Sequence, residues 1–548
     1  MIRRLFFVGV FGLCIALYAS AMRGFFLSDD MAVTFVLSGW QEKGMLWAQL
    51  FRKFFAGLDS QSHYYRPLPF LSYGLNLVAP TFDSFHWHLV NLAGHLLAGV
   101  AVFRITALLQ RDAKPGWLPG LATALFLLCG TSAEAVAWIS GRYDVFATAL
   151  LLWAGALYLQ SRASLDVFES GAWLCGILAL TSKESAAVVP GLIGCLAWVK
   201  HGELPVLDRW RAIARDFVPW LVLIIGYFAL RYALFGNMLQ VYPGTHPLER
   251  LRAGTWLPSI DALWTWLMTA LPNSAALSTA LVLSVALLLV ALGNFARNPA
   301  VRRPVIGMLG ATIVSLVLLL PHLAGFPANG EGGRLLYTTS AFASILVAVS
   351  LRRPVPRGQT HAPASFVVAV IGMALIIAHA MLLNAALRTW RTAGAQMGEL
   401  VESLARLPPS IKPDGYGIVI APDSIGATPF ARNANGALVL PPIQHDWLIR
   451  REIVYLPVDI PTLPELLKAQ LIPKLKGLSL NETGDQLKEN LAAQSDAATV
   501  WPSDMFCWSI GQSKLQRVDL PQPPDAAQWT SDVRAALRRA GCDYVPAP

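Results

Sequence analysis

Long apolar runs recur along the chain up to residue 387 and then stop. A helix of about 20 such residues crosses a hydrocarbon core of about 30 Å. The clear runs cover residues 5–22, 85–109, 118–136, 145–159, 217–235, 277–295, 305–321, 335–351 and 365–387. This pattern predicts an α-helical polytopic membrane domain over residues 1–387.

A further apolar stretch, residues 171–199, is interrupted by Lys183 and Glu184. One crossing there would place the basic residues at 162 and at 200–215 on opposite sides of the membrane. Basic loops concentrate in the cytoplasm, so we interpret the stretch as two short crossings joined at Lys183 and Glu184. The chain then crosses about eleven times, with its basic N-terminus in the cytoplasm and residues 388–548 outside.

Two of the predicted outer loops contain short apolar stretches rich in aromatic residues. Residues 65–78 are interrupted by proline, and residues 257–271 follow Trp256 and include Trp264 and Trp266. Such stretches are typical of helices that lie in the membrane surface. Tryptophan also gathers at membrane interfaces without any further role.

Residues 388–548 predict a small extracytoplasmic α+β domain. No run in this part could cross a membrane; residues 416–421, 437–440 and 453–456 read as strands, and residues 529–540 as a helix. Of the six cysteines, Cys507 and Cys542 lie in this domain. An exported domain meets oxidising conditions, so we expect these two to form a disulfide.

Composition agrees with a membrane protein. The chain is 55% hydrophobic and 14% charged, and its mean hydropathy of +0.49 is too high for a soluble globule. The net charge of +9 would suggest nucleic acid in a soluble protein. Here basic cytoplasmic loops account for it, so we expect no nucleic-acid partner.

Two adjacent carboxylates, Asp29 and Asp30, follow the first apolar run. On the outer side of the membrane they would begin the first loop, where one carboxylate can act as a general base toward a hydroxyl. We favour Asp30 as the base and Asp29 as its polar support or as a metal ligand. No cofactor follows from the sequence, and a divalent metal stays open. The alternative interpretations are a solvated loop start and a helix cap.

Further polar residues lie within or beside the apolar runs, where ionisable groups are costly and often functional. His88, Asn91 and His95 share one helical face, which indicates either a packing network or a catalytic role. Glu134 lies deep at the end of a run, and we expect Glu134, His88 and Arg142 to contact substrate.

Local ion pairs are an alternative for several of these charges. Arg142 and Asp144 are close enough in sequence to pair with each other, and so are Lys183 and Glu184. The second pair could instead face a cavity.

A phosphate at the membrane surface requires a cation, and arginine suits bidentate contact. Arg334 and Lys183 are the best placed, with Tyr337 close to the first. The glycines at 330, 332 and 333 indicate backbone close to a ligand or a plain flexible loop.

The order of these pieces resembles the membrane half of transmembrane O-mannosyltransferases that carry tetratricopeptide repeats, within the GT-C glycosyltransferases. The pieces are Tyr65-Arg66-Pro67-Leu68, Phe85 to His95, Ala133 to Arg142, Leu180 to Glu184, and Arg334-Leu335-Leu336-Tyr337. The resemblance covers about residues 1–350. It implies a polyprenyl- or dolichyl-phosphate sugar donor and inverting transfer on the non-cytoplasmic face, with Asp30 or Asp29 near the acceptor.

Two departures limit what carries over. Gly130-Thr131-Ser132 stands where the family has a His-Pro-rich stretch, and the repeats are absent. The acceptor therefore stays open among a glycan, a lipid and a protein. We expect the protein to lie in a bacterial inner membrane, with the C-terminal domain in the periplasm.

Three other functions compete with a hexosyl- or pentosyltransferase. A flippase or transporter of lipid-linked sugar predicts inverted repeats, which the sequence does not show. A polymerase or ligase of surface polysaccharide favours a site centred on Arg and His over an early aspartate pair. A sensor or scaffold would leave the polar stripes of the helices unexplained.

Overall fold

The computed structural model forms two compact units, which we treat separately. The first contains Met1–Met22 and Trp47–Arg388, and the second contains Arg23–Leu46 and Thr389–Pro548. The structure describes residues 2–56, 64–79, 82–110, 117–162, 166–236, 260–317, 330–352, 363–407, 417–432, 434, 437–444, 453–457, 504–519 and 535–542.

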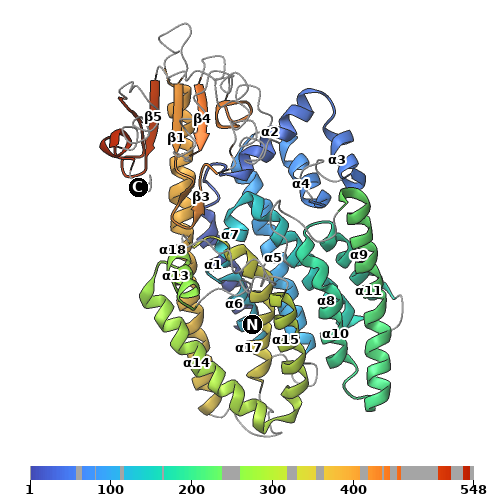
Figure 1. Cartoon of the computed structure of the whole chain (residues 1–548). Coiled ribbons are helices and arrows are strands. Elements are labelled where there is room, and N and C mark those ends of the chain that lie inside the picture. The colour runs from blue at the N-terminus through green and yellow to red at the C-terminus, as the bar shows by residue number, and fades with distance from the viewer. Residues whose placement is uncertain are drawn as a thin grey trace. The chain divides into compact units, whose positions relative to one another are not determined.

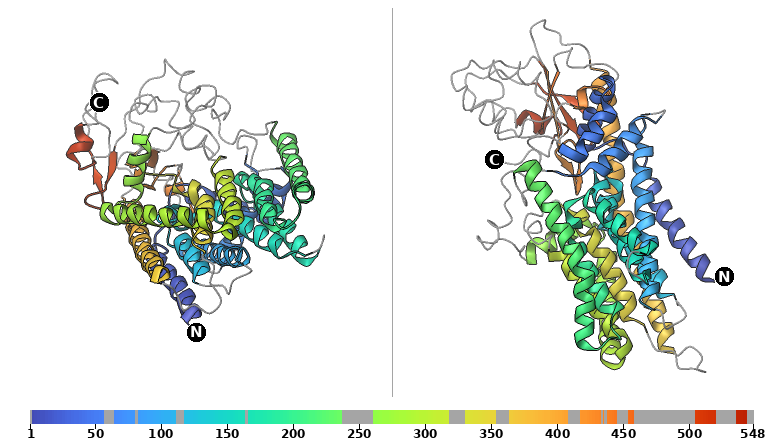
Figure 2. Two further views of the ribbon diagram at one scale, coloured as in Figure 1. Left: turned by 90° about the horizontal axis from the view of Figure 1, so that it is seen from below. Right: turned by 90° about the vertical axis from the view of Figure 1, so that its right-hand side faces the viewer.

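The first unit is helical (Figure 1). Its α-helices are α1 (Ile2–Ala19), α3 (Leu46–Ala56), α4 (Pro67–Leu77), α5 (Ser84–Leu108), α6 (Leu118–Leu127), α7 (Ser132–Ala137), α8 (Arg142–Gln160), α9 (Val167–Leu180), α10 (Val189–Lys200), α11 (Val206–Phe235), α13 (Ile260–Ala270), α14 (Ser274–Arg297), α15 (Pro299–Val317), α17 (Tyr337–Ser350) and the first part of α18 (Pro363–Ala405). Short 3₁₀ helices are η1 (Ile139–Gly141), η2 (Glu184–Val188) and η3 (Gly333–Leu336). The long helices run in roughly one common direction (Figure 2).

Apolar helices confirm an integral membrane protein. Within the described residues, six segments are long and apolar enough to cross: Ser84–Leu108, Ile139–Gln160, Val206–Phe235, Ser274–Arg297, Gly333–Ser350 and Phe366–Ala405. Shorter apolar helices cover Phe6–Ala19, Leu118–Leu127 and Val167–Leu180. The polytopic helical fold is thus confirmed, whereas the crossing number of about eleven and the orientation stay predictions.

The predicted break inside residues 171–199 is present. Helix α9 ends at Leu180, η2 follows, and α10 begins at Val189 with Pro190 in its first turn, where proline is favoured. By contrast, the single run expected over residues 118–136 is wrong. It is divided into α6 and α7, because the chain turns at Cys129 to Thr131.

The helical unit packs closely where small residues allow it. A Cβ atom on Gly94 of α5 would lie 2.7 Å from Val145 of α8, and one on Gly99 would lie 2.7 Å from Leu127. Helices in membranes associate through such close approach, since lipid offers no hydrophobic drive between them. These contacts hold α5 against α8 and α6.

The second unit contains a four-stranded sheet in the order β4-β1-β5-β6, which confirms a small C-terminal sheet region. Its strands are β1 (Gly417–Ala421), β4 (Ile453–Pro457), β5 (Asp504–Ser509) and β6 (Lys514–Arg517), with a small hairpin of β2 (Ser424–Ile425) and β3 (Thr428–Pro429). The central β1 is parallel to β4 and β5, and β6 is antiparallel to β5. The predicted strands at 416–421 and 453–456 correspond to β1 and β4.

One strand prediction is wrong. Ala437–Val439 forms the 3₁₀ helix η4, in which Ala437, Leu438 and Val439 are all buried. Successive side chains of a strand point to opposite faces of the sheet. The three consecutive buried residues instead form a tight turn in the core. The N-terminal part of the helix expected over residues 529–540 lies outside the described residues, and residues 535–539 are helical.

Helix α2 (Asp29–Glu42) belongs to this second unit with the preceding residues 23–28. It buries Met31, Thr34 and Leu37. The last part of α18 also packs in this unit, because Gln396 accepts a 3.0 Å hydrogen bond from Trp508 Nε1 of β5. Cys507 of the same strand is joined to Cys542 by a disulfide.

Candidate functional site

Glu134 and Arg334 form the first of three ion pairs in the helical unit. Glu134 lies on the short helix α7 and Arg334 on η3, at the start of α17. Arg334 Nη1 donates to Glu134 Oε1, and Gly332 N donates to Glu134 Oε2 at 2.7 Å. The guanidinium also lies 4.5 Å above the Trp138 ring. Side-chain exposure is 6% for Glu134 and 26% for Arg334.

The glycines beside Arg334 allow the chain to approach other parts of the protein. A Cβ atom on Gly333 would lie 2.8 Å from the Thr131 carbonyl oxygen. Gly330 has a φ of 86°, and a Cβ there would lie 2.6 Å from Ala270 N. The glycine-rich segment is therefore explained by its contacts with α7 and α13.

Asp144 and Lys183 form the second pair. Asp144 is in the first turn of α8, and Lys183 precedes η2. Lys183 Nζ donates to Asp144 Oδ1 at 2.5 Å, and the two side chains are 13% and 9% exposed. The predicted local pairings of Arg142 with Asp144 and of Lys183 with Glu184 are therefore wrong.

Glu184 is the partner of two arginines. Arg66 donates through Nε at 3.1 Å and through Nη2 at 2.8 Å, and Arg231 of α11 donates through Nη1 at 3.4 Å. Arg231 is 1% exposed and Glu184 15%. Burial raises the pKa of Glu184, but the charges and hydrogen bonds of the two arginines outweigh burial and hold this pKa below its ordinary value.

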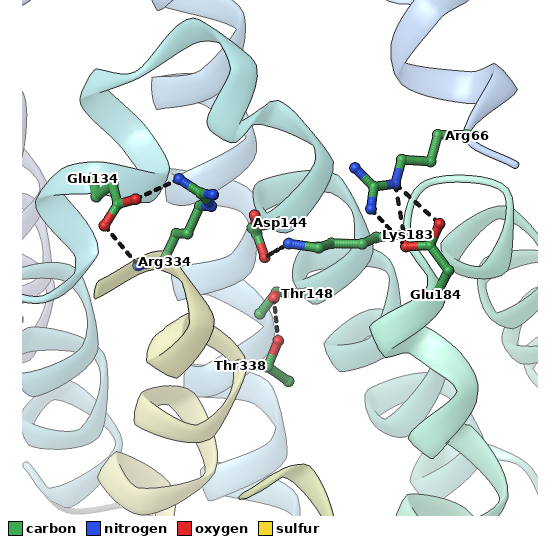
Figure 3. Close-up of polar contacts among 8 residues, drawn as sticks. All are labelled: Arg66, Glu134, Asp144, Thr148, Lys183, Glu184, Arg334 and Thr338. Atoms are coloured by element: carbon green, nitrogen blue, oxygen red, sulfur yellow. Dashed lines mark hydrogen bonds and ion pairs between the residues drawn. The ribbon is translucent and has the colours of Figure 1, made fainter. Parts of the chain in front are cut away.

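The three pairs lie at the same end of the helices (Figure 3). They are positioned by the starts of α8, α10 and α17. Another polar network, in which Asp216 accepts from Tyr158 and His201 at 2.6 and 2.7 Å, marks the other end of α8. Burying charged side chains costs free energy. A group of them at one end of a membrane bundle is therefore a candidate for binding a charged ligand.

Arg142 has a different environment from the one expected for a substrate contact. It is 0% exposed. Its Nε donates to Asn91 Oδ1 at 2.9 Å, its Nη1 to Asn76 Oδ1 at 2.7 Å and to Ser72 Oγ at 3.0 Å, and its Nη2 to the Trp87 carbonyl at 2.7 Å. Arg142 thus connects α4, α5 and α8.

The polar stripe of α5 takes part in helix packing. Asn91 donates to the Trp138 carbonyl at 2.7 Å. His95 Nδ1 lies 2.6 Å from the Tyr337 hydroxyl, and its Nε2 lies 3.1 Å from the Leu127 carbonyl. Tyr337 and His88 are almost fully buried, at 0% and 4% exposure. The expected contacts of Tyr337 with the donor phosphate and of His88 with substrate stay predictions.

Asp29 and Asp30 form the first turn of α2 rather than the start of a loop. Carboxylates are favoured there by the helix dipole. Asp30 is 1% exposed and its Oδ2 accepts a hydrogen bond from Leu27 N at 3.2 Å, whereas Asp29 is half-buried. Asp29 is therefore the more accessible of the two carboxylates.

Sequence reasoning missed Arg66 and Arg231, the two partners of Glu184. Arg66 stands out in the sequence only as part of a motif, and Arg231 lies within the apolar run of α11. The one available signal was an arginine inside a membrane helix, which is rare without a partner. Among the described residues, no group of three or more His, Cys, Asp or Glu side chains is arranged to hold a metal ion.

No family model matches the chain. It is 33% identical over 196 residues to protein O-mannosyl-transferase Tmtc1 of Drosophila melanogaster, which is 34% of this chain and 22% of that protein. It is 33% identical over 153 residues to TMTC1 of Mus musculus, covering 27% and 16%. The chain thus spans about a fifth of the length of these relatives.

Solved structures with an overall likeness include ArnT from Cupriavidus metallidurans bound to undecaprenyl phosphate. That match has a TM-score of 0.40 at 12% identity and covers 85% of this chain and 91% of that one. The oligosaccharyltransferase of Archaeoglobus fulgidus gives a TM-score of 0.42 at 11% identity, covering 76% and 62%. The sequence matches confirm the resemblance drawn from the motifs: over about a third of its length this chain is similar to protein O-mannosyl-transferases.

Proposed function

We propose that this chain is a GT-C-type membrane glycosyltransferase that moves a sugar from a polyprenyl-phosphate donor to an acceptor hydroxyl outside the cytoplasm. The observation that carries the proposal is the sequence similarity to protein O-mannosyl-transferases. The charged row at one end of the helical unit is a suitable place for a lipid phosphate.

Arg334 is the proposed contact of the donor phosphate. It is the most exposed of the four cations in the three ion pairs, at 26% against 13% for Lys183, 10% for Arg66 and 1% for Arg231. Its pairing with Glu134 and its stacking on Trp138 fix the guanidinium plane. A fixed guanidinium suits bidentate phosphate contact, and Lys183 adds a second positive charge.

The aspartate pair supplies the base in this proposal. The accessible carboxylate of Asp29 takes the proton of the acceptor hydroxyl, and the oxygen attacks the sugar carbon opposite the phosphate. The bond from that carbon to the phosphate oxygen breaks, and the configuration at the carbon is inverted. Polyprenyl phosphate leaves with its charge stabilised by Arg334. Asp30, which is buried and bonded to Leu27 N, holds the turn. This reverses the roles expected from the sequence.

The disulfide between Cys507 and Cys542 supports a location of the C-terminal domain outside the cytoplasm. We propose the periplasm of a bacterial inner membrane. The acceptor stays a glycan, lipid or protein hydroxyl.

Incubation of the purified protein with a panel of polyprenyl-phosphate sugars tests the proposal, because a transferase releases polyprenyl phosphate. A flippase would instead move the intact lipid across vesicles without release. A polymerase or ligase would lengthen or transfer a glycan carried on a lipid diphosphate.

Two isosteric variants separate the aspartates. Asp29→Asn should lower turnover on the order of 10²–10⁴-fold, the contribution of a general base. Asp30→Asn keeps an oxygen that can accept from Leu27 N and should retain most activity. The opposite ranking would restore Asp30 as the base, and wild-type turnover in both variants would remove the pair from the reaction.

A further inference from the structure

The backbone at Ser28 forms a tight turn directly before the two aspartates. Ser28 has φ 52° and ψ −123°. Asp30 N donates to the Leu27 carbonyl at 3.0 Å, and Leu27 N donates back to Asp30 Oδ2 at 3.2 Å. A positive φ is strained for a serine and persists only when surrounding contacts impose it.

Those contacts come from a loop of the C-terminal sheet. Ser28 N donates to the Phe430 carbonyl at 2.8 Å, and Ser28 Oγ donates to the Arg432 carbonyl at 2.6 Å. Asp29 Oδ1 lies farther from the same hydroxyl, at 3.5 Å. A hydroxyl has one hydrogen, so the shorter contact with Arg432 takes it.

The loop itself is braced by its own hydrogen bonds. It follows the carboxyl end of the central strand β1. Phe430 N donates to the Asp423 carbonyl at 2.9 Å, Ala431 N to the Pro422 carbonyl at 3.3 Å, and Arg432 Nε to Asp423 Oδ2 at 2.7 Å. The two carbonyls that hold Ser28 are therefore fixed with respect to the sheet.

We infer that the loop of residues 422–432 positions Asp29 and Asp30 for the reaction, acting through Ser28. This inference rests on the proposed function of the aspartates. The direction in which α2 begins decides where both carboxylates project, and the loop decides that direction through two hydrogen bonds separated from α2 by about 400 residues in sequence. The C-terminal domain thus has a role in the reaction without contacting substrate through this loop.

Two substitutions of Ser28 test the inference in the full-length protein. Ser28→Ala removes the hydroxyl and keeps the strained backbone. Ser28→Gly also removes the hydroxyl, but glycine adopts a positive φ readily, so this variant keeps the turn at lower conformational cost in the folded state. Both should lower kcat by about tenfold, the rate equivalent of one hydrogen bond of about 1.4 kcal/mol, with donor KM unchanged.

Ser509→Ala is the matched control. Ser509 is also 1% exposed and donates its hydroxyl to a backbone carbonyl in the same unit, that of Gly541 at 3.0 Å. Its removal should leave kcat at the wild-type level, because the bond lies on β5 and does not touch the aspartate turn.

Amide hydrogen exchange supplies a readout independent of turnover. Exchange in residues 25–31 should be faster in Ser28→Ala than in Ser509→Ala, since the loop no longer holds the turn. Equal kcat and equal exchange in the Ser28 variants and in Ser509→Ala would overturn the inference. Wild-type turnover in both Asp29→Asn and Asp30→Asn would instead refute the proposed base, and unchanged exchange would then refute the positioning of the turn as well.

Discussion

Glu184→Gln should destabilise the helical unit strongly. Glu184 is the shared carboxylate of Arg66 and Arg231, whose side chains are 10% and 1% exposed. Glutamine keeps the shape and one acceptor oxygen but removes the negative charge. Two buried guanidinium groups would then repel each other, and no anion would offset the free-energy cost of their desolvation.

The structure sets the size of this effect. Removing one partner of a buried ion pair costs about 3–5 kcal/mol, mainly because the remaining charge stays buried. The amide NH₂ of glutamine cannot accept a hydrogen bond, so the hydrogen bonds from Arg66 and Arg231 that anchor η2 would also weaken. Most proteins have only about 5–15 kcal/mol of stability, so the variant should lose a large part of it.

Chemical unfolding in detergent, followed by tryptophan fluorescence, measures the difference in free energy of unfolding. Glu203→Gln is the control, because Glu203 also pairs with an arginine, Arg303, but is 96% exposed. Such a surface pair contributes about 0–1 kcal/mol. If the two variants lost the same stability, the reasoning about a buried arginine pair would be refuted.

The same carboxylate predicts a pH dependence. Because the folded-state pKa of Glu184 is below its ordinary value of 4.5, its contribution is present in full above that pH. It is lost as pH falls through the lower folded-state pKa. Glu184→Gln should lack this acid-side loss, which unfolding curves at a series of pH values would show.

Three further predictions concern the donor, the disulfide and the orientation. Arg334→Ala should raise donor KM or lower kcat/KM strongly, and Arg334→Lys should recover only part, because a lysine cannot make the bidentate contact; steady-state kinetics with the donor decide this. Cys507→Ser should lower the stability of the C-terminal domain by about 3–4 kcal/mol, from a loop of 35 residues, and a wild-type unfolding curve would contradict it. A reporter that works only in the cytoplasm should be inactive when fused after Pro548, and activity there would reverse the predicted topology.

Apolar run length was sufficient to predict most of the membrane helices, since each backbone must satisfy its own hydrogen bonds in lipid. It was insufficient at Gly130, where α6 and α7 separate inside one continuous apolar run. A Cβ at Gly130 would lie 2.5 Å from Leu271 of a distant segment. The turn between α6 and α7 thus lies in a close tertiary contact, and local hydropathy contains no sign of such a contact.

The candidate site was predicted as a set of residues and not as a set of partners. Glu134, Arg334 and Lys183 stood out because charge is costly in an apolar run. Their pairing joins residues as far apart in sequence as Glu134 and Arg334, which are separated by 200 positions. Helical periodicity relates only neighbours within about two turns, so the partners became visible only in the folded chain.

The position of α2 was also beyond local pattern. Residues 23–46 follow the first apolar run, and their sequence neighbours are membrane helices. In the structure, Ser28 is bonded to Arg432, 404 positions away. Such a pairing leaves no mark on the hydrophobic pattern, because its acceptor is a backbone carbonyl, which every residue type provides.

The buried guanidinium of Arg142 has a consequence for how this sequence can change over evolutionary time. Asn91, Asn76, Ser72 and the Trp87 carbonyl all accept hydrogen bonds from it, so one residue supplies the donor for all four groups. A substitution of Arg142 would remove all four bonds in a single step, and no single second change could restore them. Positions 72, 76, 91 and 142 are therefore expected to change together or not at all.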